Sequence, residues 1–240
     1  MTMGVITYDD LKLFCYSNDK LISGGIKGIV LDFFGLGGAI MFEEAPPNAL
    51  RFAKNGLAYL IPYTDPWNWM NPTAVAMTDE IVDVLRDHYH LPENTPVIST
   101  GGSMGGLCSI VYCRYAKRTP KACVANCPVC DLPYHYTERP DLPRTLYAAY
   151  YRPGTDLTEN LKAASPLHLA DSLPRIPYTV FHCMSDRAVN LHAHSEQFVS
   201  KMQAAGQDVT FVRIPDKGHC DLGDEGWAQY LAKIEAYAGV

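Results

Sequence analysis

The chain has 240 residues, of which 48% are hydrophobic and 19% charged, and its net charge is −6. This length and composition predict a single domain over residues 1–240 with a sizeable core, and the negative charge argues against nucleic acid or an anionic membrane as partner. Since no apolar run reaches the roughly 20 residues of a membrane span and no leader is recognisable, we expect a soluble, cytoplasmic protein.

Strand-like and helix-like segments alternate along the chain. The predicted strands are residues 11–16, 28–33, 57–62, 95–100, 122–125, 176–183 and 208–215. The predicted helices are residues 47–55, a segment opened by Asn71 and Pro72, and residues 104–117, 191–205 and 227–234. This alternation is typical of an α/β fold with a doubly wound, mostly parallel sheet.

A serine stands between two glycines at the junction of a predicted strand and a predicted helix. The motif is Gly101-Gly102-Ser103-Met104-Gly105, a G-x-S-x-G pattern. Glycines lack Cβ atoms and allow the strand and helix to approach, which exposes the serine hydroxyl at the tip of a strained turn. A phosphate-binding loop would end in Lys followed by Ser or Thr, which this segment lacks. The motif therefore predicts a nucleophilic Ser103.

Two residues downstream complete a catalytic set. Asp186 follows the predicted strand 176–183, and His219 follows the predicted strand 208–215. The carboxyl ends of parallel strands open on one edge of a sheet, so Ser103, Asp186 and His219 are expected to lie together there. The chain order Ser, Asp, His matches one of the known orders of the triad. We interpret His219 as the base and Asp186 as the residue that orients it.

The remaining histidines and the cysteines carry weaker signals. His192 and His194 form an H-x-H pair, but no further ligand cluster is near in sequence, and we interpret them as a helix start rather than a metal site. Cys127 and Cys130 have redox or half-zinc-site spacing without a second pair. Reduced, buried thiols are the expected state of the eight cysteines, and no metal or organic cofactor is expected. The other histidines weighed as the base are His88, His90, His135, His168 and His182.

The carboxyl-terminal half resembles a serine hydrolase of the prolyl oligopeptidase-like branch of the α/β-hydrolase superfamily. The resemblance rests on residues 164–167, Ser185 with Asp186, and Gly218 with His219, and it extends loosely back to Gly28. It implies an α/β-hydrolase sheet with a small cap insertion at residues 131–165, whose aromatic residues would cover the pocket. A packed surface subdomain is the equal alternative for this segment. In such families a His-Gly-Gly-Gly-type loop supplies an oxyanion donor.

The loop after the strand 28–33 matches this oxyanion loop except at its first position. Phe34 stands in place of the usual histidine, followed by Gly35-Leu36-Gly37-Gly38. The donor is a main-chain N–H, so the change leaves it in place. The resemblance thus implies an oxyanion hole formed by Leu36 or Gly35 together with Met104.

The loop after the strand 57–62 should also open on the catalytic edge. It contains Tyr63, Trp67 and Trp69 in a polar setting, where tryptophans usually either pack or bind a ligand. We interpret these residues as a wall of the acyl or sugar pocket, with anchoring of the loop in the core as the equal alternative.

These features predict a carboxylic ester hydrolase that works through an acyl-enzyme on small short-chain acyl or sugar esters. An amide hydrolase of the aminopeptidase or oligopeptidase type uses the same chemistry and is the first alternative. A catalytically silent binding protein with the hydrolase fold is the second, although binding alone does not require all three of Ser103, Asp186 and His219.

Overall fold

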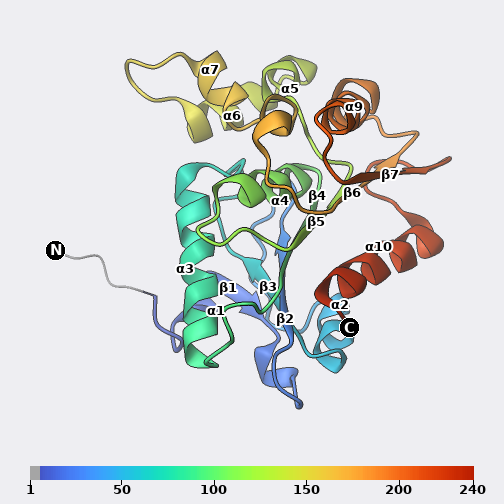
Figure 1. Cartoon of the computed structure of the whole chain (residues 1–240). Helices are drawn as coiled ribbons and strands as arrows, with labels where there is room; N and C mark the ends of the chain where they lie inside the picture. Colours follow the sequence, from blue (N-terminus) through green and yellow to red (C-terminus); the bar gives the residue numbers. More distant parts are fainter. Residues whose placement is uncertain (1–5) are drawn as a thin grey trace.

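A seven-stranded sheet forms the centre of the molecule (Figure 1). The computed structural model describes residues 6–240. The strand order is β1-β3-β2-β4-β5-β6-β7; β1 is antiparallel to β3, and all other neighbours are parallel. The strands are β1 Cys15–Ser17, β2 Gly28–Phe33, β3 Leu57–Pro62, β4 Val97–Gly102, β5 Ala122–Asn126, β6 Tyr178–Cys183 and β7 Val209–Ile214. The predicted doubly wound α/β sheet of the α/β-hydrolase type is confirmed.

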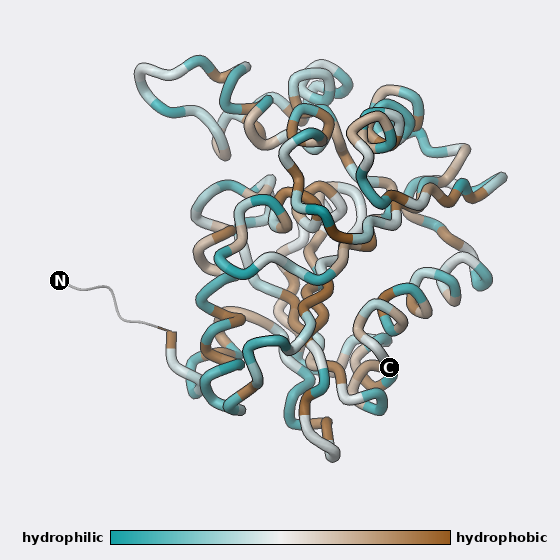
Figure 2. The backbone as a smooth tube through the Cα atoms, viewed as in Figure 1, coloured by the Kyte–Doolittle hydropathy of each residue, from teal (hydrophilic) through white to brown (hydrophobic). Residues whose placement is uncertain are grey.

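Helices cover both faces of the sheet, and successive strand residues serve opposite faces. In β2, Ile29 and Leu31 pack in the cluster that includes α3 and α4, whereas Val30 packs in the cluster that includes α2 and α10. Figure 2 accordingly shows the hydrophobic residues concentrated along the central strands. The flanking helices are α1 Leu11–Phe14, α2 Pro47–Lys54, α3 Pro72–His88, α4 Met104–Tyr115, α9 Gln197–Ala204 and α10 Gly223–Ala238.

Three predicted boundaries need correction. Residues 11–14 form the short helix α1 rather than a strand, because pairing with β3 begins only at Cys15, opposite Pro62. Helix α4 ends at Tyr115, and the N–H of Lys117 instead donates to Asp79. The predicted helix 191–205 starts as a π-helical turn at residues 192–196, where the N–H of Glu196 donates to the carbonyl of Leu191.

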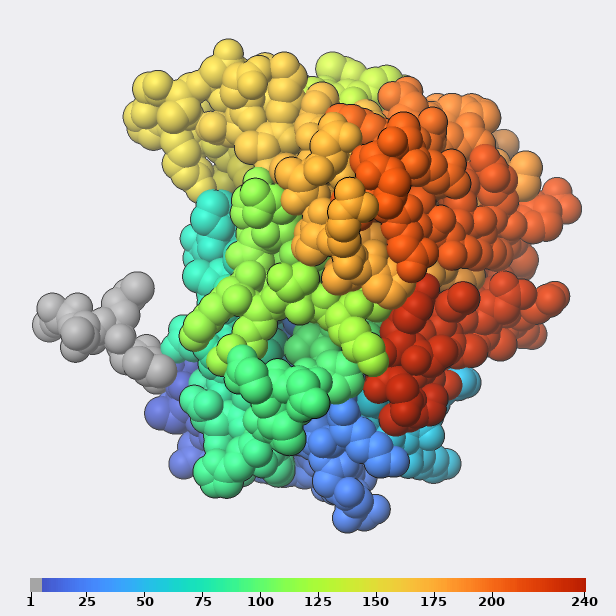
Figure 3. Space-filling view, in the orientation of Figure 1, coloured from blue at the N-terminus to red at the C-terminus, as the bar shows by residue number. Residues whose placement is uncertain are grey.

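A helical segment, residues 131–165, connects β5 to the elements before β6. It contains α5 Leu132–Glu138, α6 Leu142–Tyr150 and α7 Leu157–Lys162, and is followed by α8 Pro166–Leu169. In Figures 1 and 3 it forms the top of the molecule, beside α9. No helix in the described part of the chain combines the length and apolar character needed to cross a lipid bilayer.

Candidate active site

Ser103 occupies a strained turn between β4 and α4. Its φ is 59° and its ψ −123°, a conformation that costs a residue with a side chain about 1–3 kcal/mol. A Cβ on Gly105 would lie 2.0 Å from the carbonyl oxygen of Phe33, and one on Gly101 would lie 2.5 Å from that of Gly105. Only glycine fits at these two positions. The strand, sharp turn and helix expected around Ser103 are all present.

Asp186 and His219 are hydrogen-bonded to each other at the same edge of the sheet. Asp186 Oδ2 lies 2.6 Å from His219 Nδ1. The second carboxylate oxygen accepts hydrogen bonds from the N–H groups of Ala188 at 2.8 Å and Val189 at 3.0 Å. These contacts fix the carboxylate, which is fully buried. Because His219 donates its Nδ1–H to Asp186, the lone pair of the neutral imidazole is on Nε2.

The surroundings of His219 favour its protonated form. Burial by itself lowers the pKa of His219, but the hydrogen bond to Asp186 and the charge of that carboxylate raise it above the usual value. A stabilised imidazolium makes it easier for Nε2 to accept a proton from a nearby hydroxyl.

One cavity of 480 Å³ brings Ser103 and His219 together. Within residues 6–240, no hydrogen bond joins Ser103 Oγ to His219 Nε2; such contacts often tighten only when substrate binds. The cavity is lined by Gly35, Leu36, Trp69, Gly102, Ser103, His135, Arg139, Ala188, Val189, His219 and Cys220.

The loop after β2 lies against the serine turn. A Cβ on Gly35 would lie 3.8 Å from Ser103 Cβ, and Leu36 lines the cavity. Among the described residues, the N–H groups of Leu36 and Met104 have no protein acceptor; Met104 is the first residue of α4, where N–H groups lack partners within the helix. These two N–H groups are therefore available to a negatively charged oxygen in the cavity.

The three aromatic residues predicted to line the pocket lie in different places. Trp69 lines the cavity and is buried, and its indole N–H donates to Thr145 Oγ1 at 3.1 Å. Trp67 is 40% exposed and does not line this cavity. Tyr63 lines a separate cavity near the amino terminus, where its hydroxyl accepts the Phe42 N–H. Tyr63 and Trp67, which were expected to form a wall of the same pocket as Trp69, do not line the cavity that contains Ser103.

Replacing Trp69 with alanine should reduce both stability and the binding of bulky substrates. The side chain is buried and lines the cavity, so truncation removes packing worth about 3–5 kcal/mol. We expect a lower Tm and a larger rise in KM for bulky substrates than for small ones. Trp67→Ala is the matched control and should change the free energy of unfolding by less than about 0.5 kcal/mol. Equal effects of the two substitutions would contradict this assignment.

Two further cavity residues, His135 and Arg139, were not predicted to line the pocket; they come from α5 and its C-terminal end. His135 Nδ1 bonds Glu138 Oε2 at 2.5 Å, which leaves Nε2 without a protein partner in the part of the chain described. Arg139 makes two hydrogen bonds to Asp141, of 3.0 and 2.6 Å. The H-x-x-E spacing of His135 and Glu138 on one helix was the available signal, since residues three apart share a helix face.

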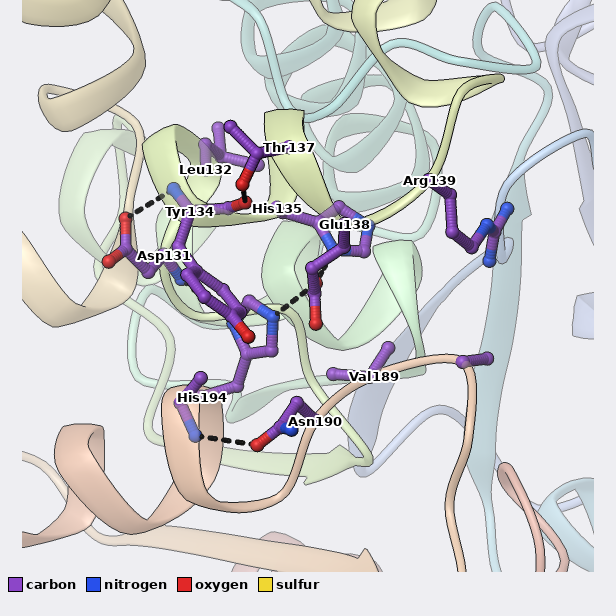
Figure 4. A network of polar contacts seen from close by, with 12 residues as sticks. Asp131, Leu132, Tyr134, His135, Thr137, Glu138, Arg139, Val189, Asn190 and His194 are labelled. Carbon is purple, nitrogen blue, oxygen red and sulfur yellow. Dashed lines mark hydrogen bonds and ion pairs between the residues drawn. The ribbon is translucent and has the colours of Figure 1, made fainter.

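Glu138 joins His135 to His194, as Figure 4 shows. His194 Nε2 lies 2.9 Å from Glu138 Oε2, and its Nδ1 accepts hydrogen bonds from the N–H groups of Cys130 and Asp131. Nδ1 is therefore unprotonated, and Nε2 carries the hydrogen that Glu138 accepts. Burial alone would raise the pKa of Glu138, but the two histidines lower it to about 2. A metal would have to displace that hydrogen, so we interpret this cluster as a hydrogen-bonded support for His135.

Comparison with protein families finds one match. The model described as the prolyl oligopeptidase family matches residues 78–238, which include Ser103, Asp186 and His219. No curated protein sequence matches the chain.

Solved structures with the same fold include peptidases and an esterase. Acylaminoacyl peptidase from Pyrococcus horikoshii has a TM-score of 0.69 and 14% identity, over 90% of this chain and 37% of that one. A puromycin-hydrolyzing peptidase from Mycobacterium tuberculosis has a TM-score of 0.70 and 17% identity, over 90% and 34%. Esterase 2 from Thermogutta terrifontis, phosphoramylated by tabun, has a TM-score of 0.64 and 18% identity, over 93% and 87%. The chain thus spans about a third of the length of those peptidases.

Proposed function

The chain belongs to the prolyl oligopeptidase family of serine hydrolases, and from this premise we propose that it hydrolyses small carboxylic esters. In this proposal Ser103 is the nucleophile, His219 the general base and Asp186 the residue that orients the imidazole. The observation that carries the proposal is the 2.6 Å contact between Asp186 and His219, next to a cavity that also contains the strained Ser103.

The proposed reaction has two halves. Ser103 Oγ attacks the ester carbonyl while its proton moves to His219 Nε2, and the carbonyl oxygen becomes an oxyanion held by the N–H groups of Leu36, or Gly35, and Met104. Collapse of this intermediate breaks the ester C–O bond, and His219 gives its proton to the departing alkoxide. A water molecule, deprotonated by His219, then hydrolyses the acyl-enzyme and restores the Ser103 hydroxyl.

The walls of the cavity favour an ester over a peptide. Four lining residues are apolar and suit an acyl group: Leu36, Trp69, Ala188 and Val189. Apart from Ser103, His219 and Cys220, the polar side chains that line the cavity and could recognise a substrate are His135 and Arg139, both from the helical segment. A peptide main chain presents several donors and acceptors, each of which is costly to leave unpaired. The amide hydrolase remains the second candidate, since Arg139 can donate to a substrate carbonyl.

A fluorophosphonate probe tests the nucleophile directly. We expect it to modify Ser103 in the native protein, as located by mass spectrometry, and to leave Ser103→Ala unmodified. Ser99→Ala serves as the control, because Ser99 is buried on β4 and donates to the carbonyl of Ser109 instead of facing the cavity. Absence of labelling in the native protein, or labelling that persists in Ser103→Ala, would contradict the proposal and favour a silent binding protein.

Matched substrates test ester against amide. We expect a p-nitrophenyl ester to be cleaved with a much higher kcat/KM than the anilide with the same acyl group. A higher kcat/KM for aminoacyl anilides would instead identify the protein as an amide hydrolase with the same nucleophile.

We further propose that the protein works in a reducing compartment such as the cytoplasm. All eight cysteines are free, and seven of them are buried. Disulfides are typical of oxidising compartments, whereas reduced buried thiols suit a reducing one. Growth with the protein fused to a compartment-specific reporter would test this location.

A further inference from the structure

Two cysteines lie beside His219, outside the roles already assigned. Cys220 follows His219 directly in the chain, is partly exposed and lines the cavity. Cys127 follows β5 and is buried. Both residues have positive φ values, 59° and 45°, so the backbone is bent at each of them. The two turns bring residues 93 positions apart to the same point at the sheet edge.

The three side chains form a group with metal-ligand spacing. Cys127 Sγ, Cys220 Sγ and one ring nitrogen of His219 all lie within 4.8 Å of one another. The distance from His219 Nε2 to Cys220 Sγ is 3.7 Å. With zinc bonds of about 2.3 Å to sulfur and 2.0–2.1 Å to nitrogen, tetrahedral ligands lie roughly 3.5–3.8 Å apart. One pair of donor atoms therefore already has the required separation, and the third needs to move by about 1 Å at most.

The surrounding hydrogen bonds suit a bound cation. Asp186 binds His219 Nδ1, which leaves Nε2 as the metal-binding nitrogen and strengthens it as a ligand. The N–H of Cys183 lies 3.3 Å from Cys127 Sγ and can stabilise a thiolate there. The carboxylate of Asp186 and the two cysteine thiolates would together offset the positive charge of a divalent cation. His219 and Cys220 both line the cavity, so a cation held by them could be reached from it.

The other half of the C-x-x-C pair is not part of this group. Cys130 Sγ donates to the carbonyl of Pro128, and its burial raises the pKa of the thiol. The C-x-x-C spacing pairs Cys127 with Cys130, but in the structure the side chain of Cys127 is grouped with those of His219 and Cys220.

We propose that Cys127, His219 and Cys220 form a binding site for a thiophilic divalent cation, with Zn²⁺ as the cation to test, and that the bound cation inhibits the hydrolase. On binding, each thiol loses a proton to solvent, and the cation takes the lone pair of His219 Nε2. That nitrogen can then no longer accept a proton from Ser103. The inhibition rests on the proposed function, whereas the binding does not.

Cadmium binding tests the site independently of activity. The protein is titrated with Cd²⁺ under a phosphine reductant, which keeps the cysteines free, and the ultraviolet absorption of cadmium–thiolate bonds is recorded. We expect one equivalent to bind with this absorption in the native protein. In Cys220→Ser the affinity for Cd²⁺ should fall by at least roughly 10–100-fold. That is the loss seen at metal sites when only a residue hydrogen-bonded to a ligand is removed, and here a ligand itself is lost. Cys130→Ala is the matched control and should bind like the native protein.

Inhibition by Zn²⁺ tests whether a cation bound at this site blocks hydrolysis. Each variant is compared with its own rate without metal, using a short-chain ester. We expect Zn²⁺ to inhibit the native protein and Cys130→Ala, EDTA to restore activity, and Cys220→Ser to need on the order of 100 times more Zn²⁺. Should Cys220→Ser fold poorly, Cys127→Ala provides the second test of the same ligand set.

The possible outcomes separate the two proposals. Cadmium–thiolate absorption in a protein without any esterase or amidase activity would support the site and contradict the proposed function. Hydrolase activity unaffected by saturating Zn²⁺, or cadmium binding unchanged in Cys220→Ser, would overturn the metal site and leave the proposed function standing.

Discussion

Replacing Ser103 with alanine should lower kcat/KM for a short-chain aryl ester by on the order of 10⁵–10⁶-fold, because the oxygen that we propose as the nucleophile is lost. His219→Ala should cause a loss of similar size, since the proton acceptor is required for the same step. In the proposed mechanism the two residues act as one unit, so the double variant Ser103→Ala/His219→Ala should be no slower than either single variant. Steady-state kinetics on purified variants with native Tm values measures all three.

His192→Ala provides the control for histidine loss. The His192 side chain is 80% exposed and pairs with Glu196 on the surface, away from the cavity. Its removal should leave kcat/KM unchanged. The assignment fails if Ser103→Ala retains more than about 1% of native activity, or if the losses in the double variant multiply as they do for independent sites.

The sequence predicted the central strands well because they are buried on both faces. β2 and β3 match the predicted ranges residue for residue, and β6 matches within two residues at each end. Continuous apolar runs between glycine, proline and polar residues are a strong local signal. The edge strand β1 is only three residues long and pairs on one side with β3. Its pattern is too short to separate it from the helical turn that precedes it.

The parts of the site that follow directly from strand ends were also predictable. Ser103, Asp186 and His219 each stand just after a parallel strand, so the sheet itself brings them to one edge. His135 and Arg139 reach the cavity from α5, whose position depends on how the helical segment packs over the sheet. Nothing local in residues 131–165 encodes that packing, and nothing local places Cys127 near Cys220.

The loop after β3 could be predicted only in part from the sequence. Its aromatic residues were predicted as a group, yet only Trp69 lines the cavity. Both Trp69 and Met70 have positive φ values, 47° and 55°, and the bend at these residues directs Trp69 inward while Trp67 stays exposed. Such a bend is decided by tertiary contacts such as the 2.6 Å hydrogen bond from the Tyr150 hydroxyl to the Trp69 carbonyl.

Replacing Gly105 with alanine should disrupt the site through the backbone alone. The added Cβ would lie 2.0 Å from the carbonyl oxygen of Phe33, so α4 and β2 must move apart. Overpacking of this kind costs about 1–3 kcal/mol or more. A displacement of roughly 1 Å at a reacting group lowers rates by about 100-fold. We therefore expect a lower Tm together with at least a 100-fold loss of kcat/KM, although Ser103, Asp186 and His219 are unchanged.

Gly24→Ala separates this effect from a general loss of glycine flexibility. Gly24 has no heavy atom within 4 Å of an added Cβ and no positive φ, so alanine should be neutral or slightly stabilising there. If Gly105→Ala is too unstable to purify, fluorophosphonate labelling in fresh lysate, normalised to the amount of soluble protein, gives the same comparison. Native labelling and a native Tm in Gly105→Ala would mean that α4 can shift away from β2 freely, and that the close approach of helix and strand does not hold the serine in place.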